Sequence, residues 1–344
     1  MSFTLISLDD FVGNSQMRET FARIRLPSVA LFTGPSGVGK KTLALSLAAG
    51  IHCKIAEQRP CLQCSSCLKV QSRNHPDTLL IDREWVEVTM KNAKKTYNPR
   101  VITLEVARAL VREAQYMPFE SERRVFILDD VEKLNISASN ALLKTLEEPI
   151  PTNHFVLVTA HPEQLLPTIL SRCQRFAFRG LSRSEVETHL RTRELDSPEM
   201  RAGFAQGSIG RGLELKLERV IADRDQMFKL LEAWCRRPVF AAIFKACHEK
   251  ALLADLKDRE RTLELLEQLA LLGEDLYYLT TKQPDRVVSR DRMEELGNLK
   301  DSVSLDWIAG FLYHVGQSAE NVKRYITPLV CFETLWLESS KPNA

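Results

Sequence analysis

Residues 34–41 read Gly-Pro-Ser-Gly-Val-Gly-Lys-Lys, a run whose residue types and spacing suit the binding of phosphate. Its glycines let backbone N–H groups turn inward around phosphate oxygens, and Lys40 can reach the terminal phosphates of a nucleotide. These glycines are Gly34, Gly37 and Gly39. An apolar run at 28–33 precedes the loop as a predicted strand, and a helical pattern at 42–48 follows it. This context favours a phosphate site over a glycine-rich turn without a ligand.

The loop departs from its usual form at Lys41. A nucleotide hydrolase normally has a Ser or Thr at this position, whose hydroxyl holds Mg²⁺. Thr42 cannot replace it, because one step along a helix turns a side chain by about 100°. We therefore expect a site where ATP or ADP binding is possible but hydrolysis is poor.

A second run suited to nucleotide chemistry is the apolar strand at 125–128, which ends in Asp129 and Asp130. Asp129 takes the position of the carboxylate that faces Mg²⁺ in nucleotide hydrolases. Hydrolytic relatives commonly have Glu next, to orient the attacking water, whereas Asp130 is one methylene shorter. A misplacement of about 1 Å is costly to catalysis. Like Lys41, this departure indicates poor ATP hydrolysis. The alternative is that the two acids merely cap the strand.

Four of the eight cysteines crowd into one segment with the spacing Cys-x7-Cys-x2-Cys-x2-Cys. They are Cys53, Cys61, Cys64 and Cys67. Four thiolates can surround one Zn²⁺ tetrahedrally, so we predict a closed, structural zinc site. An iron–sulfur cluster and unligated thiols are the alternatives; no Cys-Pro follows and one cysteine lies upstream, which disfavours the cluster. The four scattered cysteines are interpreted as small core residues, namely Cys173, Cys235, Cys247 and Cys331.

Length, charge and hydropathy indicate a multidomain protein without a membrane span. A chain of 344 residues is long enough for two or three domains. Its net charge of +2 indicates no overall affinity for nucleic acid. No apolar stretch reaches the length of a membrane span and no signal sequence is visible, so no membrane partner and a cytoplasmic location are expected. The basic stretch 89–100 is interpreted as a solvated loop, with a DNA contact as the alternative.

Elements of two kinds divide the chain. Predicted strands alternate with helices up to about residue 180, which indicates an α/β core with a parallel sheet covered on both faces. The strands are expected at 29–33, 78–81, 125–128, 155–159 and 176–178, and helices after the phosphate loop and at 105–115 and 139–146. Helical patterns dominate afterwards. We predict domains at 1–180 with the cysteine insertion at about 53–67, at 181–217 as a small helical domain, and at 218–344 as an all-α bundle.

Local signals support this helical part. Ser182 is predicted to be an N-cap, with Glu185 completing a capping box. Apolar residues at three- and four-residue spacing predict one buried face between 263 and 277, ending at Tyr277. A similar pattern at 318–337 includes Tyr325, and Pro328 is expected to interrupt it.

Two further motifs complete the pattern. The run 140–149 reads Asn-Ala-Leu-Leu-Lys-Thr-Leu-Glu-Glu-Pro, an amphipathic helix that ends at Pro149, and Ser171-Arg172-Cys173 precedes the last predicted strand. With the phosphate loop, the four cysteines, the paired acids and the run Gly-Ser-Ile-Gly-Arg at 207–211, these motifs make the chain resemble a bacterial clamp-loader subunit of the AAA+ superfamily. The resemblance spans residues 34–211, and the C-terminal helices match only in general pattern.

The resemblance implies roles for individual residues. Arg172 would act in trans as an arginine finger on the ATP of a neighbouring subunit. Thr159 falls at the first sensor position and Arg211 at the second. The small helical domain would be the lid, and the C-terminal bundle would be the collar that joins a hetero-pentamer with gamma/tau and delta subunits. The assembly would place a sliding clamp on primed DNA.

The sequence is consistent with three functions. Lys41 and Asp130 favour a stator subunit of the DNA polymerase III loader with little or no ATPase activity of its own. The first alternative is an ATP-hydrolysing motor subunit of gamma/tau type, which requires that Lys41 is tolerated beside Mg²⁺. The second is a zinc-dependent DNA-binding module.

Overall fold

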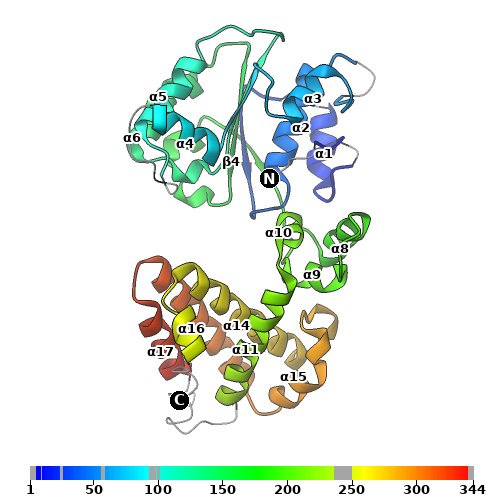
Figure 1. Cartoon of the computed structure of the whole chain (residues 1–344), viewed down its shortest axis with the longest axis vertical. Coiled ribbons are helices and arrows are strands. Elements are labelled where there is room, and N and C mark those ends of the chain that lie inside the picture. Colours follow the sequence, from blue (N-terminus) through cyan, green and yellow to red (C-terminus); the bar gives the residue numbers. More distant parts are fainter. Residues whose placement is uncertain are drawn as a thin grey trace. The chain divides into compact units, whose positions relative to one another are not determined.

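The computed structural model describes residues 5–8, 10–23, 26–55, 59–92, 98, 101–235 and 250–339. Two compact units make up the chain (Figure 1). The first comprises Met1–Pro198 and Ala205–Leu213, and the second Glu199–Phe204 and Glu214–Ala344. The predicted boundaries at 181 and 218 do not coincide with this division, and the three-domain organisation stays a prediction.

A five-stranded sheet forms the centre of the first unit, in the order β2-β3-β4-β1-β5. All neighbouring strands are parallel. The strands are β1 (Val29–Thr33), β2 (Thr78–Ile81), β3 (Arg124–Leu128), β4 (Asn153–Thr159) and β5 (Gln174–Ala177). Every residue of β1, β3 and β4 is buried, as expected for parallel strands covered on both faces. All five predicted strands are therefore present, with ends displaced by up to two residues.

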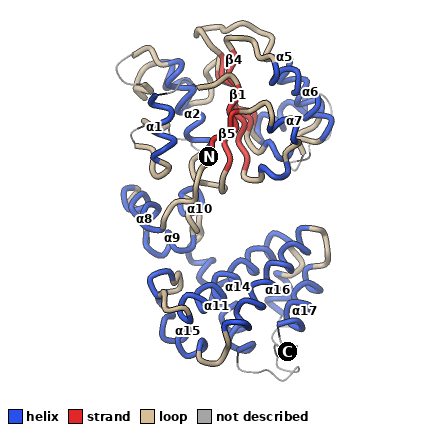
Figure 2. The backbone as a smooth tube through the Cα atoms, turned by 180° about the vertical axis from the view of Figure 1, so that it is seen from behind, coloured by secondary structure: helices blue, strands red, loops and turns tan. Residues whose placement is uncertain are grey.

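Helices cover both faces of this sheet (Figure 2). One face packs against α1 (Ser15–Arg23), α2 (Lys40–His52) and α3 (Ser65–Gln71), and the other against α4 (Arg83–Asn92), α5 (Leu104–Glu113), α6 (Ile136–Glu147) and α7 (Pro167–Leu170). Strand residues alternate between the two cores: Phe32 belongs to the first and Leu31 to the second. Short 3₁₀ turns are η1 (Val131–Lys133) and η2 (Pro162–Gln164).

Asp77 fixes a loop beside the edge strand β2. Its carboxylate is fully buried and accepts hydrogen bonds from three successive backbone N–H groups, those of Phe119, Glu120 and Ser121, at 2.7–2.9 Å. Arg124 lies 3.8 Å away. Although burial raises the pKa of Asp77, the three N–H donors outweigh it and the pKa is lowered.

Replacing Asp77 with Ala should destabilise the first unit by about 3 kcal/mol, because it leaves three N–H groups without their acceptor and removes the carboxylate that faces the buried guanidinium of Arg124. Amide hydrogen exchange in β2 and β3 would measure this loss. Glu120→Ala is the matched control, since Glu120 carries an exposed carboxylate paired with Lys69. Equal protection of the β2 and β3 amides in both variants would show that Asp77 does not stabilise the first unit.

Three short helices follow the sheet: α8 (Arg183–Thr192), α9 (Pro198–Phe204) and α10 (Ile209–Glu214). The predicted capping box at the start of α8 is confirmed, with Ser182 and Glu185 each accepting from the other's backbone N–H. Glu185 also pairs with Arg179 at 2.7 Å. This bond, with the Ser182 bonds, lowers the pKa of Glu185 to about 2 against the opposing effect of burial.

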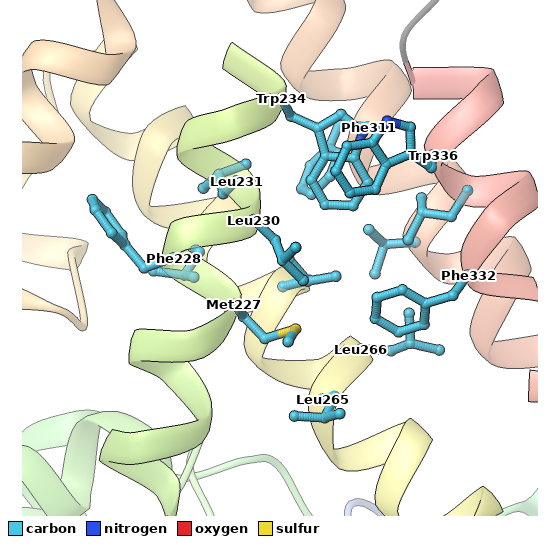
Figure 3. Close-up of a cluster of buried hydrophobic side chains, with 14 of the residues drawn as sticks. Met227, Phe228, Leu230, Leu231, Trp234, Leu265, Leu266, Phe311, Phe332 and Trp336 are labelled. Atoms are coloured by element: carbon cyan, nitrogen blue, oxygen red, sulfur yellow. The ribbon is translucent and has the colours of Figure 1, made fainter. Parts of the chain in front are cut away.

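In the second unit, the elements among the described residues are all helices, as predicted. Its elements are α11 (Leu217–Cys235), α13 (Lys250–Asp255), α14 (Arg259–Thr280), η3 (Pro284–Arg286), η4 (Arg290–Arg292), α15 (Met293–Lys300), α16 (Leu305–Lys323) and α17 (Pro328–Ser339). Figure 3 shows the aromatic centre of its core. The rings of Trp234 and Trp336 stack with centroids 4.3 Å apart, and Phe311 meets Trp234 edge-on. The interruption at Pro328 is confirmed, because α17 begins there.

Three details of the sequence prediction are wrong. Tyr277 is 38% exposed because the buried side of α14 turns through Leu272 and Leu276. Tyr325 is exposed after the end of α16. The loop expected at 89–100 does not begin at residue 89, since α4 continues to Asn92 and Lys91 pairs with Glu87 inside this helix.

Some sequence interpretations fall on residues outside the described set. Lys94, Lys95 and Arg100 of the basic stretch lie there, as does Cys247. In the part of the chain that the structure describes, no helix is both long and apolar enough to cross a membrane.

Candidate functional site

The phosphate loop connects β1 to α2, as predicted. Gly34, Gly37 and Gly39 all have positive φ, and Gly39 is the left-handed N-cap of α2. A side chain at Gly37 would also collide with Ser208, because a Cβ there would lie 2.0 Å from the Ser208 hydroxyl oxygen. Glycine is therefore required by backbone conformation and by packing.

Lys40 is buried and lies across the loop. Its Nζ donates to the carbonyl oxygens of Gly34 at 2.5 Å and Pro35 at 2.6 Å. Burial lowers the pKa of Lys40, while nearby carboxylates act in the opposite direction. In order of effect these carboxylates are Asp129, Glu132 and Asp130. A phosphate that binds here would replace the two carbonyl contacts of Lys40.

Lys41 forms an ion pair with Asp129. The Lys41 Nζ lies 2.8 Å from Asp129 Oδ2, and the Asp129 side chain is 18% exposed. Asp129 directly follows β3, and Lys41 lies in the first turn of α2. The two residues predicted on either side of Mg²⁺ thus meet each other, so the carboxylate expected to face a metal ion already has a cation of the chain itself.

Asp130 pairs with a different lysine. Its backbone is left-handed at φ 52°, and its carboxylate pairs with Lys133 at 2.7 Å in an exposed position. The turn η1 brings Glu132 back towards the site instead, where one carboxylate oxygen accepts from Ala160 N at 3.4 Å. The other oxygen is buried and has no hydrogen-bond partner among the described residues. Sequence analysis did not single out Glu132. The direction of its side chain depends on the left-handed turn at Asp130, and the sequence does not specify that turn.

The two predicted sensor residues lie on separate elements of the first unit. Thr159 ends β4 next to Thr33 of β1, and its hydroxyl accepts from His161 N at 2.9 Å. Arg211 belongs to α10, which packs on the phosphate loop through a bond of 3.0 Å from Gly210 N to Gly37 O. Arg211 N donates to Ser208 Oγ. The structure therefore brings the segment of Arg211 to the phosphate loop.

Arg172 follows α7 and pairs with the last residue of α6. Its Nη2 and Nε donate to Glu147 Oε2 at 2.8 and 3.2 Å, and its Nη1 donates to the carbonyl oxygen of Thr168 at 2.9 Å. The Arg172 side chain is 28% exposed to solvent. Its described contacts are to α6 and α7, with none to the phosphate loop.

The four clustered cysteines converge on one point. All four Sγ atoms lie within 4.8 Å of one another, and those of Cys61 and Cys67 are 3.9 Å apart. Four thiolates at about 2.3 Å from a central Zn²⁺ require similar separations. Three of these cysteines also belong to the core between the sheet and α2, so the site is continuous with the fold.

Hydrogen bonds from backbone N–H groups to sulfur lower the pKa of two of these thiols. The backbone N–H groups of Gln63 and Cys64 lower the pKa of Cys61. Burial raises the pKa of Cys64, but N–H groups of Cys67 and Lys54 outweigh it and bring the pKa to about 6. Burial keeps the pKa of Cys67 raised. The donor set, four sulfurs with N–H support, fits a structural metal such as zinc.

Known proteins similar to the chain identify its family. The family model described as DNA polymerase III, delta subunit matches residues 14–182. The delta′ subunit of Bacillus subtilis DNA polymerase III is 28% identical over 275 residues, which cover 79% of this chain and 78% of that protein. The chain belongs to the DNA polymerase III clamp-loader family. Within this family it is of the delta′ type, related to gamma/tau.

Two other clamp-loader relatives are more similar over shorter regions. The tau/gamma subunit of Haemophilus influenzae is 34% identical over 56% of this chain and 27% of its own length. The delta′ subunit of Pseudomonas aeruginosa is 34% identical over 42% of this chain and 40% of its own length. The chain thus spans well under two thirds of either relative.

Structural likeness to solved family members is distant. A gamma-subunit-related protein from Thermotoga maritima is 16% identical with a TM-score of 0.43, covering 95% of this chain and 98% of that one. The description of the clamp-loader core as a parallel, AAA+-like α/β fold followed by helices therefore rests on the strand order and pairing given above. The predicted fold class is confirmed.

Proposed function

We propose that this clamp-loader subunit is a stator that hydrolyses little or no ATP itself. The observation that carries the proposal is the 2.8 Å ion pair between Lys41 and Asp129. A divalent ion at this position would have to displace an ammonium group and would lack the usual hydroxyl ligand. Asp130 adds to the effect, because its carboxylate faces Lys133 and is not available to orient water.

In the proposed assembly the chain acts on its neighbours. Arg172 serves as an arginine finger on the ATP of an adjacent gamma/tau subunit, because a guanidinium is a permanent, forked donor for phosphate. The chain joins gamma/tau and delta subunits in a cytoplasmic hetero-pentamer through its C-terminal helices, which form the collar. The pentamer loads the sliding clamp onto primed DNA. The four cysteines hold a structural zinc ion.

Steady-state phosphate release by the pure chain tests the stator role. We expect no turnover above the background of a Lys40→Ala variant, with or without Mg²⁺. Robust Mg²⁺-dependent release from the wild type alone would refute the proposal and favour the gamma/tau-type motor.

Lys41→Thr should make nucleotide binding depend on Mg²⁺, because it frees Asp129 and supplies the missing hydroxyl. We expect Mg²⁺ to tighten ADP binding about tenfold in this variant and to have little effect in the wild type. Titration of a fluorescent ADP analogue with Mg²⁺ or with EDTA measures the difference. Lys41→Met, which frees Asp129 without adding a hydroxyl, is the control. Equal Mg²⁺ dependence in wild type and Lys41→Thr would contradict the blocking role of Lys41.

A further inference from the structure

The guanidinium of Arg172 is held by a network of acceptors. Glu147 Oε2 accepts two of its five N–H groups, and Thr168 O accepts a third. Ser171 Oγ lies 3.4 Å from Nη1. Among the described residues, the second N–H of Nη2 has no acceptor, so an outward edge of the guanidinium remains for an oxygen supplied by another molecule.

The helices that carry this network pack in one core. Arg172 follows α7, whose Ile169 is fully buried in the same core as Leu142 and Leu146 of α6. The helices α6 and α7 pack against each other. Glu147 and Thr168 are therefore fixed relative to each other, and a side chain bonded to both has few orientations left.

Glu147 lies at an electrostatically unfavourable place for its own helix. It is the last residue of α6, where the carbonyl ends of the helix carry partial negative charge. A second acid, Glu148, follows it. Helix stability therefore gives no reason for a carboxylate here, whereas Arg172 does.

We propose that Glu147 is a positioning residue for the arginine finger. It holds the guanidinium of Arg172 through Nε and Nη2, so that the outward edge is presented to the nucleotide phosphates of the neighbouring subunit before that nucleotide arrives. This inference rests on the proposed function, because it requires Arg172 to act in trans. It also gives a role to the Glu-Glu-Pro end of the run 140–149, which the stator role alone leaves unexplained.

The test is ATP turnover by a loader reconstituted with gamma/tau, delta, clamp and primed DNA. Glu147→Ala should lower kcat two- to fivefold with KM for ATP unchanged, since a half-exposed ion pair is worth about that factor. Glu147→Gln keeps an oxygen acceptor at the same place and should restore kcat to within twofold of wild type. Glu148→Ala is the matched control, and its kcat should equal that of wild type.

Two comparisons separate this inference from the function on which it rests. In an Arg172→Ala background, Glu147→Ala should cause no further loss, whereas a defect of folding or assembly would add to it. A normal kcat for Glu147→Ala in a loader that Arg172→Ala inactivates would overturn only the positioning role. Unchanged turnover in Arg172→Ala itself would overturn the proposed function, and this inference with it.

Discussion

Arg172→Ala is expected to reduce ATP turnover of the reconstituted loader by at least about 10³-fold, the smallest effect typical of a lost arginine finger. The guanidinium supplies permanent positive charge, and its remaining Nη2 N–H can donate where charge develops on the transferred phosphate. Because we propose that this chain does not itself hydrolyse ATP, the defect should appear only in the complete assembly. Clamp loading on primed DNA should fall in parallel.

Arg172→Lys distinguishes charge from geometry at this position. The ammonium of Lys keeps the charge but has no planar fork, so we expect only partial recovery of turnover. Arg191→Ala is the matched control, because Arg191 also makes an exposed pair with a glutamate, Glu187, at 2.6 Å. Native mass spectrometry of each variant should give the same complex as wild type. A fully active Arg172→Ala loader of correct composition would show that Arg172 is a surface charge and no finger.

The sequence was sufficient for the sheet because the relevant signal is local. Buried parallel strands appear as continuous apolar runs, and the five runs from Val29 to Ala177 all form strands. The positions of Lys41 and Asp129 on either side of the expected metal site also follow from motif and topology. Their direct ion pair does not, since it joins residues 88 apart and depends on the distance between α2 and the end of β3.

Features that depend on a single turn or on helix packing were not predictable. The left-handed backbone of Asp130 turns its carboxylate towards Lys133 and brings Glu132 towards the site, and no residue type in this run demands that conformation. The pairing of Arg172 with Glu147 requires α7 to pack on α6. Tyr277 was wrongly predicted to be buried. Its spacing suits the buried face, but the core lies against a different side of α14.

Removal of the zinc ion that we propose for the cysteine cluster is expected to unfold the segment 53–67 and to lower the melting temperature of the chain by about 10 °C. Structural zinc contributes its binding free energy to folding, and a loss of about 3 kcal/mol shifts the melting temperature of a large unit by roughly this amount. The effect should reach beyond the segment, because Cys53, Cys61 and Cys67 also pack in the core beneath α2. Circular dichroism before and after strong chelation would measure it.

Variants and metal substitution identify the ligands. The purified chain should contain one zinc ion, and Co²⁺ in its place should give the visible absorption of a tetrahedral thiolate site. Cys64→Ser should lose most of the metal. Cys173→Ser is the control: Cys173 lies outside the cluster and its pKa is raised to about 11 by burial, so the zinc content should stay at one. Iron and sulfide in the purified chain would contradict the zinc assignment and indicate an iron–sulfur cluster. A metal-free chain with an unchanged melting temperature would show that the four thiols pack without a ligand.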